Sequence, residues 1–224
     1  MTTAAAAAAS VTVLAQLPWA IGVNAVVAWL GYRARTVSRS GTISGALIGI
    51  VIYAAGGWRA WVLLFATFFV AAAASRFGVK RKVLLGIEEE RGGRRGAGNA
   101  FANCGIAAFA AVAAVTTTHH TAAWLAFVAA LTAGGSDTVA SEIGKAWGKS
   151  TFLVTNLGRV KPGTPGAMSL EGTTAGVVAA FGLALMAVAL GQITTTMIVA
   201  VVGGATVGAL VERPRGGARG SEVS

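Results

Sequence analysis

Two carboxylates stand in a segment of small and polar residues that interrupts an apolar stretch, Gly134-Gly-Ser-Asp-Thr-Val-Ala-Ser-Glu142. Carboxylates at membrane depth are costly unless they are paired or functional. On a helix Asp137 shares a face with Ser141, and Thr138 shares one with Glu142, because residues four apart are neighbours. Asp137 and Glu142 lie about 140° apart on an ideal helix, so they form no single chelate unless the glycine pair loosens the helix. They could instead hold different parts of a metal–polyphosphate complex, or form a structural ion pair with a loop arginine.

A pair of amides begins another apolar stretch, Gly98-Asn-Ala-Phe-Ala-Asn103. Asn99 and Asn103 are four residues apart and so share one helix face. One interpretation is a helix N-cap with an interhelical hydrogen bond. The other is a pair of amides directed at a polar ligand at the mouth of the bundle.

A turn-rich segment, Lys161-Pro-Gly-Thr-Pro-Gly166, leads through Ser169-Leu-Glu-Gly-Thr173 into the next apolar stretch. The start of a helix has unpaired N–H groups and a positive dipole end, which favour phosphate. Lys161 adds a point charge, and the hydroxyls of Thr164, Ser169 and Thr173 add donors. An ordinary capped helix start is the alternative.

The three segments together contain metal-binding carboxylates, hydroxyl and amide donors, a lysine and a helix N-terminus. Mg²⁺ prefers oxygen ligands and binds through one or two carboxylates plus phosphate oxygens. Phosphoryl transfer depends on this positioning and charge neutralisation more than on a covalent nucleophile. The combination therefore indicates phosphoryl transfer with Asp137 and Glu142 as magnesium ligands.

The elements that position these residues must lie in a membrane. The chain has 224 residues, of which 55% are hydrophobic and only 12% charged, whereas a soluble domain has about 25% charged residues. High hydrophobicity also excludes a disordered chain. The net charge of +10 lies in short loops between apolar segments, so it indicates membrane topology rather than nucleic-acid binding. A single cysteine, Cys104, excludes an internal disulfide framework.

Seven apolar segments predict a single all-α, polytopic membrane domain over residues 1–224, with a basic loop at about 76–98 and a motif-bearing loop at about 145–172. The predicted spans are Val11–Leu30, Thr42–Ala55, Trp58–Ala74, Asn99–Thr117, Thr121–Gly144, Thr173–Leu190 and Ile193–Val211. Lys and Arg fall in alternate loops, and only Arg59 falls on the other side. This pattern predicts an N-terminus outside and a C-terminus in the cytoplasm of a multi-pass cell-membrane protein. Gly45 with Gly49 and Gly204 with Gly208 predict close helix packing.

The motifs give the chain a specific resemblance over about residues 38–212. It resembles the integral-membrane phytyl-phosphate kinases of plants and cyanobacteria and their relatives (domain-of-unknown-function family 92). The matching elements are Gly98–Asn103, Ser136–Glu142, Pro162–Gly166 and Ser169–Thr173. The chain also resembles, more weakly, the CTP-dependent phytol and dolichol kinases. The similar residues are Asp137, Lys145, Lys161 and Glu171-Gly-Thr173.

The resemblance implies a Mg²⁺-dependent phosphotransferase that acts on a lipid substrate. A nucleoside triphosphate, plausibly CTP, would phosphorylate an isoprenyl monophosphate of the phytyl type to its diphosphate. The implied catalytic residues are Asp137, Glu142 and Lys161. The implied substrate-binding and nucleotide-binding residues are Asn99, Asn103, Ser136, Thr138, Ser141, Thr164, Ser169, Glu171 and Thr173. Family members usually have an Asp-Ser pair where this chain has Gly204-Ala205, which implies altered substrate choice, completion of the site by another chain in a homo-oligomer, or lost activity.

Three other functions fit the residues. A polyprenol kinase would act on the alcohol itself. A transporter of a small ion or anionic metabolite also uses intramembrane Asp and Asn with helix-breaking glycines, although its polar groups commonly lie near the midplane. A non-catalytic membrane scaffold would fit the missing Asp-Ser pair.

Overall fold

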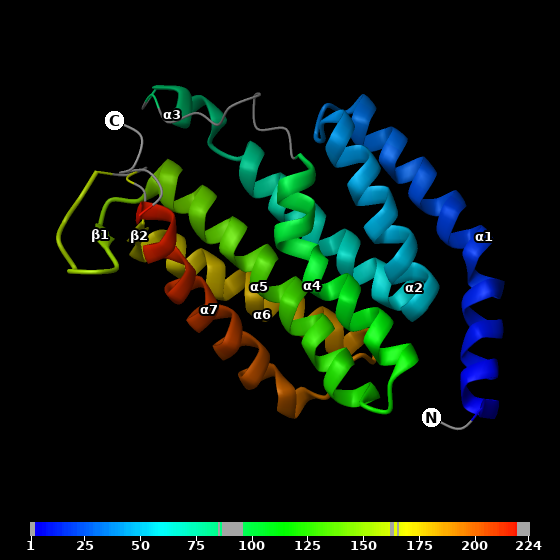
Figure 1. Ribbon diagram of the computed structural model, residues 1–224. Helices are drawn as coiled ribbons and strands as arrows, with labels where there is room; N and C mark the ends of the chain where they lie inside the picture. The colour runs from blue at the N-terminus through cyan, green and yellow to red at the C-terminus, as the bar shows by residue number, and fades with distance from the viewer. Residues whose placement is uncertain (1–2, 85, 87–95, 162–163, 165, 219–224) are drawn as a thin grey trace. The chain divides into compact units, whose positions relative to one another are not determined.

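The computed structural model describes residues 3–84, 86, 96–161, 164 and 166–218 (Figure 1). Its helices are α1 (Thr3–Arg33), α2 (Arg39–Arg76), α3 (Val79–Leu84), α4 (Ala97–Thr116), α5 (His120–Trp147), α6 (Leu170–Ala189) and α7 (Ile198–Ala218), with a 3₁₀ turn at Thr195–Met197. Strands β1 (Thr151–Leu153) and β2 (Ala167–Ser169) form an antiparallel pair between α5 and α6, with Thr151 opposite Ser169. The all-α membrane fold is therefore confirmed, with one small hairpin that the sequence analysis did not predict.

Five helices in the described chain are long and apolar enough to cross a membrane: α1 (from Val11), α2, α4, α5 and α6. Residues Thr195–Ala209 form a shorter apolar helix. Helix α2 contains both the second and the third predicted spans. Its backbone breaks at Gly57, where φ is 67° and ψ is −167°, and Figure 1 shows the chain reversing direction there. Each arm of α2 has about the length of one membrane crossing, and glycine is favoured at the break because it alone tolerates positive φ without steric cost.

The chain divides into two compact units. The first unit comprises Met1–Ala66, Arg94–Leu131 and Leu185–Met197; the second comprises Thr67–Gly93, Thr132–Ala184 and Ile198–Ser224. Helices α2, α5 and α6 each contribute to both. The prediction of a single domain over 1–224 is not tested by this division.

The core of the first unit forms where small residues let helices approach. Asn24 of α1 is buried, donates to the Ala20 carbonyl oxygen at 2.8 Å and accepts from the Trp61 indole N–H at 3.0 Å. A Cβ atom on Gly49 would lie 1.9 Å from the Asn24 Oδ1 atom. The predicted close approach at Gly49 is thus confirmed, whereas a Cβ on Gly45, Gly204 or Gly208 would meet no described atom within 4 Å.

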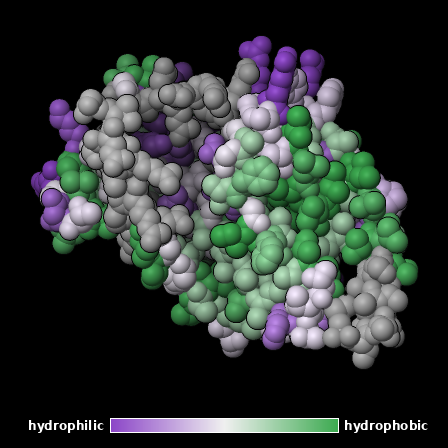
Figure 2. Space-filling model, in the orientation of Figure 1, coloured by the Kyte–Doolittle hydropathy of each residue, from purple (hydrophilic) through white to green (hydrophobic). Residues whose placement is uncertain are grey.

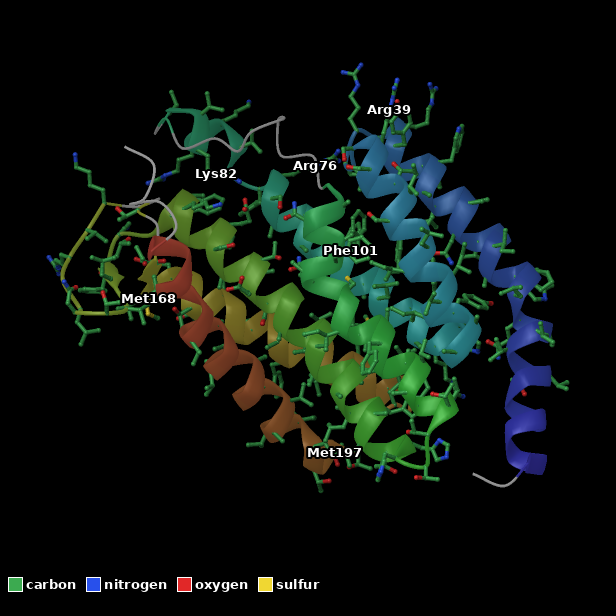
Figure 3. The ribbon with its side chains drawn as sticks, in the orientation of Figure 1. Arg39, Arg76, Lys82, Phe101, Met168 and Met197 are labelled. Atoms are coloured by element: carbon green, nitrogen blue, oxygen red, sulfur yellow. The ribbon has the colours of Figure 1, made fainter. Side chains whose placement is uncertain are left out.

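The surface of the first unit separates apolar from charged residues. Figure 2 shows hydrophobic side chains over the face formed by α1, α2 and α4, with hydrophilic side chains gathered at its upper edge. Arg33 ends α1 and Arg39 begins α2, and Figure 3 labels Arg39 at that edge. Arg59, by contrast, follows the break of α2. Arginines at both ends of an apolar helical arm about 27 Å long fit a membrane crossing, while the inside–outside orientation stays a prediction.

Candidate functional site

Two of the predicted motifs meet in the second unit, along the contact between α5 and α6. A Cβ atom on Gly172 of α6 would lie 2.3 Å from the Ala140 carbonyl oxygen and 2.9 Å from the Cα atom of Gly144, both on α5. One turn further along, a Cβ on Gly176 would lie 3.1 Å from the Ser136 carbonyl oxygen. The two helices therefore touch backbone to backbone, which only residues without a Cβ permit. This contact joins the Ser136–Glu142 segment to the Ser169–Thr173 segment.

The glycine pair in the α5 motif does not loosen the helix, and Gly135 makes room for side chains of α6 and α2. Helix α5 continues through Gly134 and Gly135. A Cβ on Gly135 would lie 2.9 Å from Leu183 Cδ1 and 2.9 Å from Thr67 Cγ2. Because the helix stays regular, Asp137 and Glu142 keep their angular separation. The described residues contain no group of three or more His, Cys, Asp or Glu side chains close enough to hold a metal ion.

Helix α6 begins with a side-chain cap. The Ser169 hydroxyl accepts a hydrogen bond from the Gly172 backbone N–H at 3.0 Å, which satisfies one of the unpaired donors of the first turn. Glu171 lies in that turn, and its Oε1 atom accepts a hydrogen bond from the Lys149 N–H at 3.2 Å. This bond links the start of α6 to the segment after α5. A negative charge in the first turn also suits the positive end of the helix dipole.

Several buried oxygens at this helix start have no hydrogen-bond partner among the described residues. They are Thr151 Oγ1, Glu171 Oε2 and Thr173 Oγ1. Thr151, opposite Ser169 in the hairpin, is only 5% exposed. Buried polar atoms are normally paired, so these oxygens are candidate contacts for a ligand or a water, as are the unpartnered atoms of Gln16, Thr132 and Gln192 elsewhere. Thr151 was not predicted as a site residue, because its position depends on a three-residue strand with no pattern of its own.

A buried ion pair lies at the end of α5. The Lys82 ammonium of α3 contacts Glu142 Oε2 and donates to the Ser75 carbonyl oxygen at 2.9 Å. Lys145 Nζ lies 3.5 Å from the other carboxylate oxygen, Oε1. Figure 3 labels Lys82 on α3 and Arg76 at the end of α2. The predicted alternative of an ion pair at Glu142 is therefore present, with two lysines among its partners.

The remaining predicted residues have simpler surroundings. On α5, the hydroxyls of Ser136, Thr138 and Ser141 donate to backbone carbonyls of their own helix, and Asp137 is half-buried. Lys161 is exposed, and its carbonyl oxygen accepts the Thr164 hydroxyl at 2.7 Å. Pro162, Gly163 and Pro165 of the third motif lie outside the described residues.

The predicted amide pair belongs to the first unit. Asn99 is exposed and Asn103 half-buried, both near the start of α4. The binding of a polar ligand by Asn99 and Asn103 stays a prediction. On α7 of the second unit, Ala205 is buried and Gly204 is exposed; these are the positions at which the resemblance implies an Asp-Ser pair.

Comparison with known proteins identifies the class. Residues 22–216 match the family described as Integral membrane protein DUF92, and the chain belongs to this family. The resemblance predicted from the four motifs is thereby confirmed.

The relatives come from cyanobacteria, plants and archaea. An uncharacterized membrane protein of Synechocystis, sll0875, is 43% identical over 66% of this chain and 58% of its own length. Protein VTE6, chloroplastic, of Arabidopsis thaliana is 40% identical over 70% of this chain and 49% of its own. An uncharacterized membrane protein of Methanocaldococcus jannaschii is 28% identical over 71% and 65%. The chain thus matches about half of the length of the first two relatives. No solved structure is significantly similar to it.

Proposed function

We propose that the chain is a membrane-embedded isoprenoid kinase. It transfers the terminal phosphoryl group of a nucleoside triphosphate to an oxygen of an isoprenyl monophosphate, giving the isoprenyl diphosphate and a nucleoside diphosphate. The observation that carries this proposal is the α5–α6 contact, where two motifs of the kinase-like pattern meet beside the unpartnered oxygens of Thr151, Glu171 and Thr173. Membership of the same family as VTE6 supports it.

Each group of residues at the site has its own chemical role in the proposed transfer. The start of α6 offers N–H groups and a positive dipole end to phosphate oxygens, with the exposed Lys161 as a mobile point charge. The Thr173 hydroxyl in the first turn of α6 and the Thr151 hydroxyl on β1, opposite Ser169, offer further donors. Mg²⁺ would be held by Asp137 together with phosphate oxygens and would neutralise charge that develops during transfer. The carboxylate of Glu142 faces two ammonium groups, which weakens it as a ligand for Mg²⁺.

The acceptor would enter from the bilayer. An apolar isoprenoid tail is most soluble among lipid chains, and its phosphate must remain at the interface where the charged residues lie. We propose that this interface is the cytoplasmic side of a cell membrane, because the basic loops flank it. The nucleotide is then taken from the cytoplasm and CTP is the first donor to test, given the likeness to CTP-dependent kinases.

The test uses purified protein in detergent with Mg²⁺. CTP, ATP, GTP and UTP are each offered with phytyl, geranylgeranyl and farnesyl monophosphates and with the three alcohols. Diphosphate should form with wild type and with the exposed neighbour variant Thr174→Ala, and should fall at least 100-fold with Asp137→Asn. Product from alcohols alone would make the protein a polyprenol kinase. Folded protein that gives no product, yet takes up ions in proteoliposomes without consuming nucleotide, would be a transporter.

A further inference from the structure

A short juxtamembrane segment, residues 76–84, follows a membrane-spanning arm of α2. The second arm of α2, residues 58–76, is about 28 Å long, which is close to the thickness of the hydrocarbon core of a bilayer. The chain then turns at Gly78, where φ is 77°, and α3 begins at the next residue. Because α3 follows the end of the arm so closely, we place it at the level of the lipid headgroups.

The apolar side chains of the juxtamembrane segment are exposed. Phe77 is 64% exposed, Val83 49% and Leu84 86%. Val79 is 45% exposed and shares a helix face with Val83, because the two residues are four apart. Apolar side chains gathered on one short segment are unfavourable in water, whereas the boundary between headgroups and acyl chains stabilises them.

The same segment is strongly basic. Residues 76–84 contain four Lys or Arg and no Asp or Glu. Lys80 and Arg81 are exposed on α3, and Lys80 shares a helix face with Leu84. At a membrane surface, long basic side chains lay their methylene groups along apolar surface and keep their charged ends among the polar groups. The juxtamembrane segment therefore complements an anionic lipid in both charge and hydrophobicity.

Lys82 is the exception on α3, because it is turned inward and only 4% exposed. Its ammonium contacts Glu142 Oε2 and donates to the Ser75 carbonyl oxygen. Figure 3 labels Lys82 on α3. Since a buried charge is strongly disfavoured without its partner, this contact holds α3 against the end of α5.

A second contact with α5 lies at the turn before α3. The Phe77 ring packs on the Trp147 ring, with 4.8 Å between the ring centroids. A Cβ atom on Gly78 would lie 2.6 Å from Trp147 Cη2 and 2.8 Å from the Cβ atom of Ala146. The turn and the middle of α3 are thus both fixed to α5, and this leaves the exposed apolar and basic side chains on the outside.

We propose that residues 76–84 form an interfacial anchor that binds the headgroups of anionic phospholipids. The side chains of Val79, Val83 and Leu84 enter the boundary between headgroups and acyl chains. Lys80 and Arg81 bind the lipid phosphates, and Lys82 holds the anchor against α5. The partner is the bilayer that surrounds the protein, so the binding of lipid does not depend on the proposed kinase activity.

The first experiment locates the anchor in the full chain, reconstituted in lipid nanodiscs. Cys104→Ala removes the single cysteine, and Leu84→Cys then carries an environment-sensitive fluorophore. Phe109→Cys is the control for lipid contact, because Phe109 is 75% exposed on the apolar helix α4. Nitroxide lipids labelled near the headgroup should quench the Leu84 probe, and those labelled deep in the acyl chain should quench the Phe109 probe. Quenching at Phe109 without any quenching at Leu84 would overturn the proposal.

The second experiment tests headgroup charge with the Leu84 probe, at low ionic strength where electrostatic attraction is least screened. Nitroxide-labelled phosphatidylglycerol should quench the probe at least threefold more than the same amount of labelled phosphatidylcholine. The double variant Lys80→Gln/Arg81→Gln should remove this preference, and the charge-preserving Lys80→Arg/Arg81→Lys should keep it. Equal quenching by the two lipids in the parent protein, or an unchanged preference in the glutamine variant, would show that the segment binds no anionic headgroups.

Discussion

Asn24 in the first unit and Glu142 in the second are both polar, both buried on helices, and both approached closely by another helix. Asn24 is neutral, and its amide donates to Ala20 and accepts from Trp61. Glu142 contacts two lysines, and elsewhere in the second unit three oxygens at the start of α6 have no hydrogen-bond partner among the described residues. A neutral, satisfied network fixes helix packing at small cost, whereas a buried charge is costly unless it is paired or functional. The comparison predicts a structural role for Asn24 and a functional role for residues of the second unit.

The largest expected effect comes from Gly172→Ala. The new methyl group would lie 2.3 Å from the Ala140 carbonyl oxygen, so α5 and α6 must separate and the two motifs must move apart. Kinase activity should fall at least 100-fold, since small displacements at a catalytic site cost about that much. Activity assays on folded protein, checked by thermal unfolding, measure it. Gly182→Ala, whose Cβ meets no described atom within 4 Å, is the control on the same helix, and equal activity in both variants would remove the α5–α6 contact from the site.

The second prediction concerns the neutral network. Asn24→Ala removes both hydrogen bonds and leaves the Trp61 N–H unpaired, which should lower the free energy of unfolding by about 1–3 kcal/mol. Activity per folded molecule should stay within twofold of wild type. Thermal unfolding in detergent and the kinase assay test the two halves separately. A 10-fold loss of kcat without loss of stability would place Asn24 among the functional residues and break the comparison.

The third prediction uses the unpartnered Thr151 hydroxyl. Thr151→Val keeps the shape and removes an unsatisfied buried oxygen, so stability should be unchanged or up to about 1 kcal/mol higher. Nucleotide KM should nevertheless rise about 3–10-fold, as expected for the loss of one hydrogen bond to a ligand. Thr132, fully buried with an unpartnered Oγ1, provides the matched variant Thr132→Val, which should leave KM unaltered. Lower stability in Thr151→Val would show that its hydroxyl supports the hairpin.

The smallest effect is expected at Gly45, one helical turn before Gly49. Alanine at Gly45 meets no described atom and has a better helix propensity by about 0.8–1.0 kcal/mol. The melting temperature should rise by a few degrees or stay constant, while Gly49→Ala, which contacts Asn24, should lower it. Comparison of the two melting temperatures tests whether α1 approaches α2 closely at Gly49 and not at Gly45. An equal fall in melting temperature for both variants would contradict this.

Hydropathy and charge were enough to predict the membrane class and the helical segments, because the lipid environment requires long apolar helices with satisfied backbones. Each of the seven predicted spans overlaps a helix for most of its length, including two that α2 joins across Gly57. The motif order was enough to predict the family. These properties depend on local composition and spacing, which a sequence displays directly.

The partners of each side chain depended on tertiary structure. Lys82 is one of several basic residues between Arg76 and Arg95, and only the packing of α3 turns it inward to Glu142. From the sequence alone, Gly134 and Gly135 could have loosened the helix. The structure shows instead that Gly135 leaves room for the side chains of Leu183 and Thr67. The hairpin that buries Thr151 has strands of three residues, too short for a periodic pattern. Composition thus determined that the chain folds in a membrane and where its helices lie. Long-range packing decided which charged groups and hydroxyls lie together.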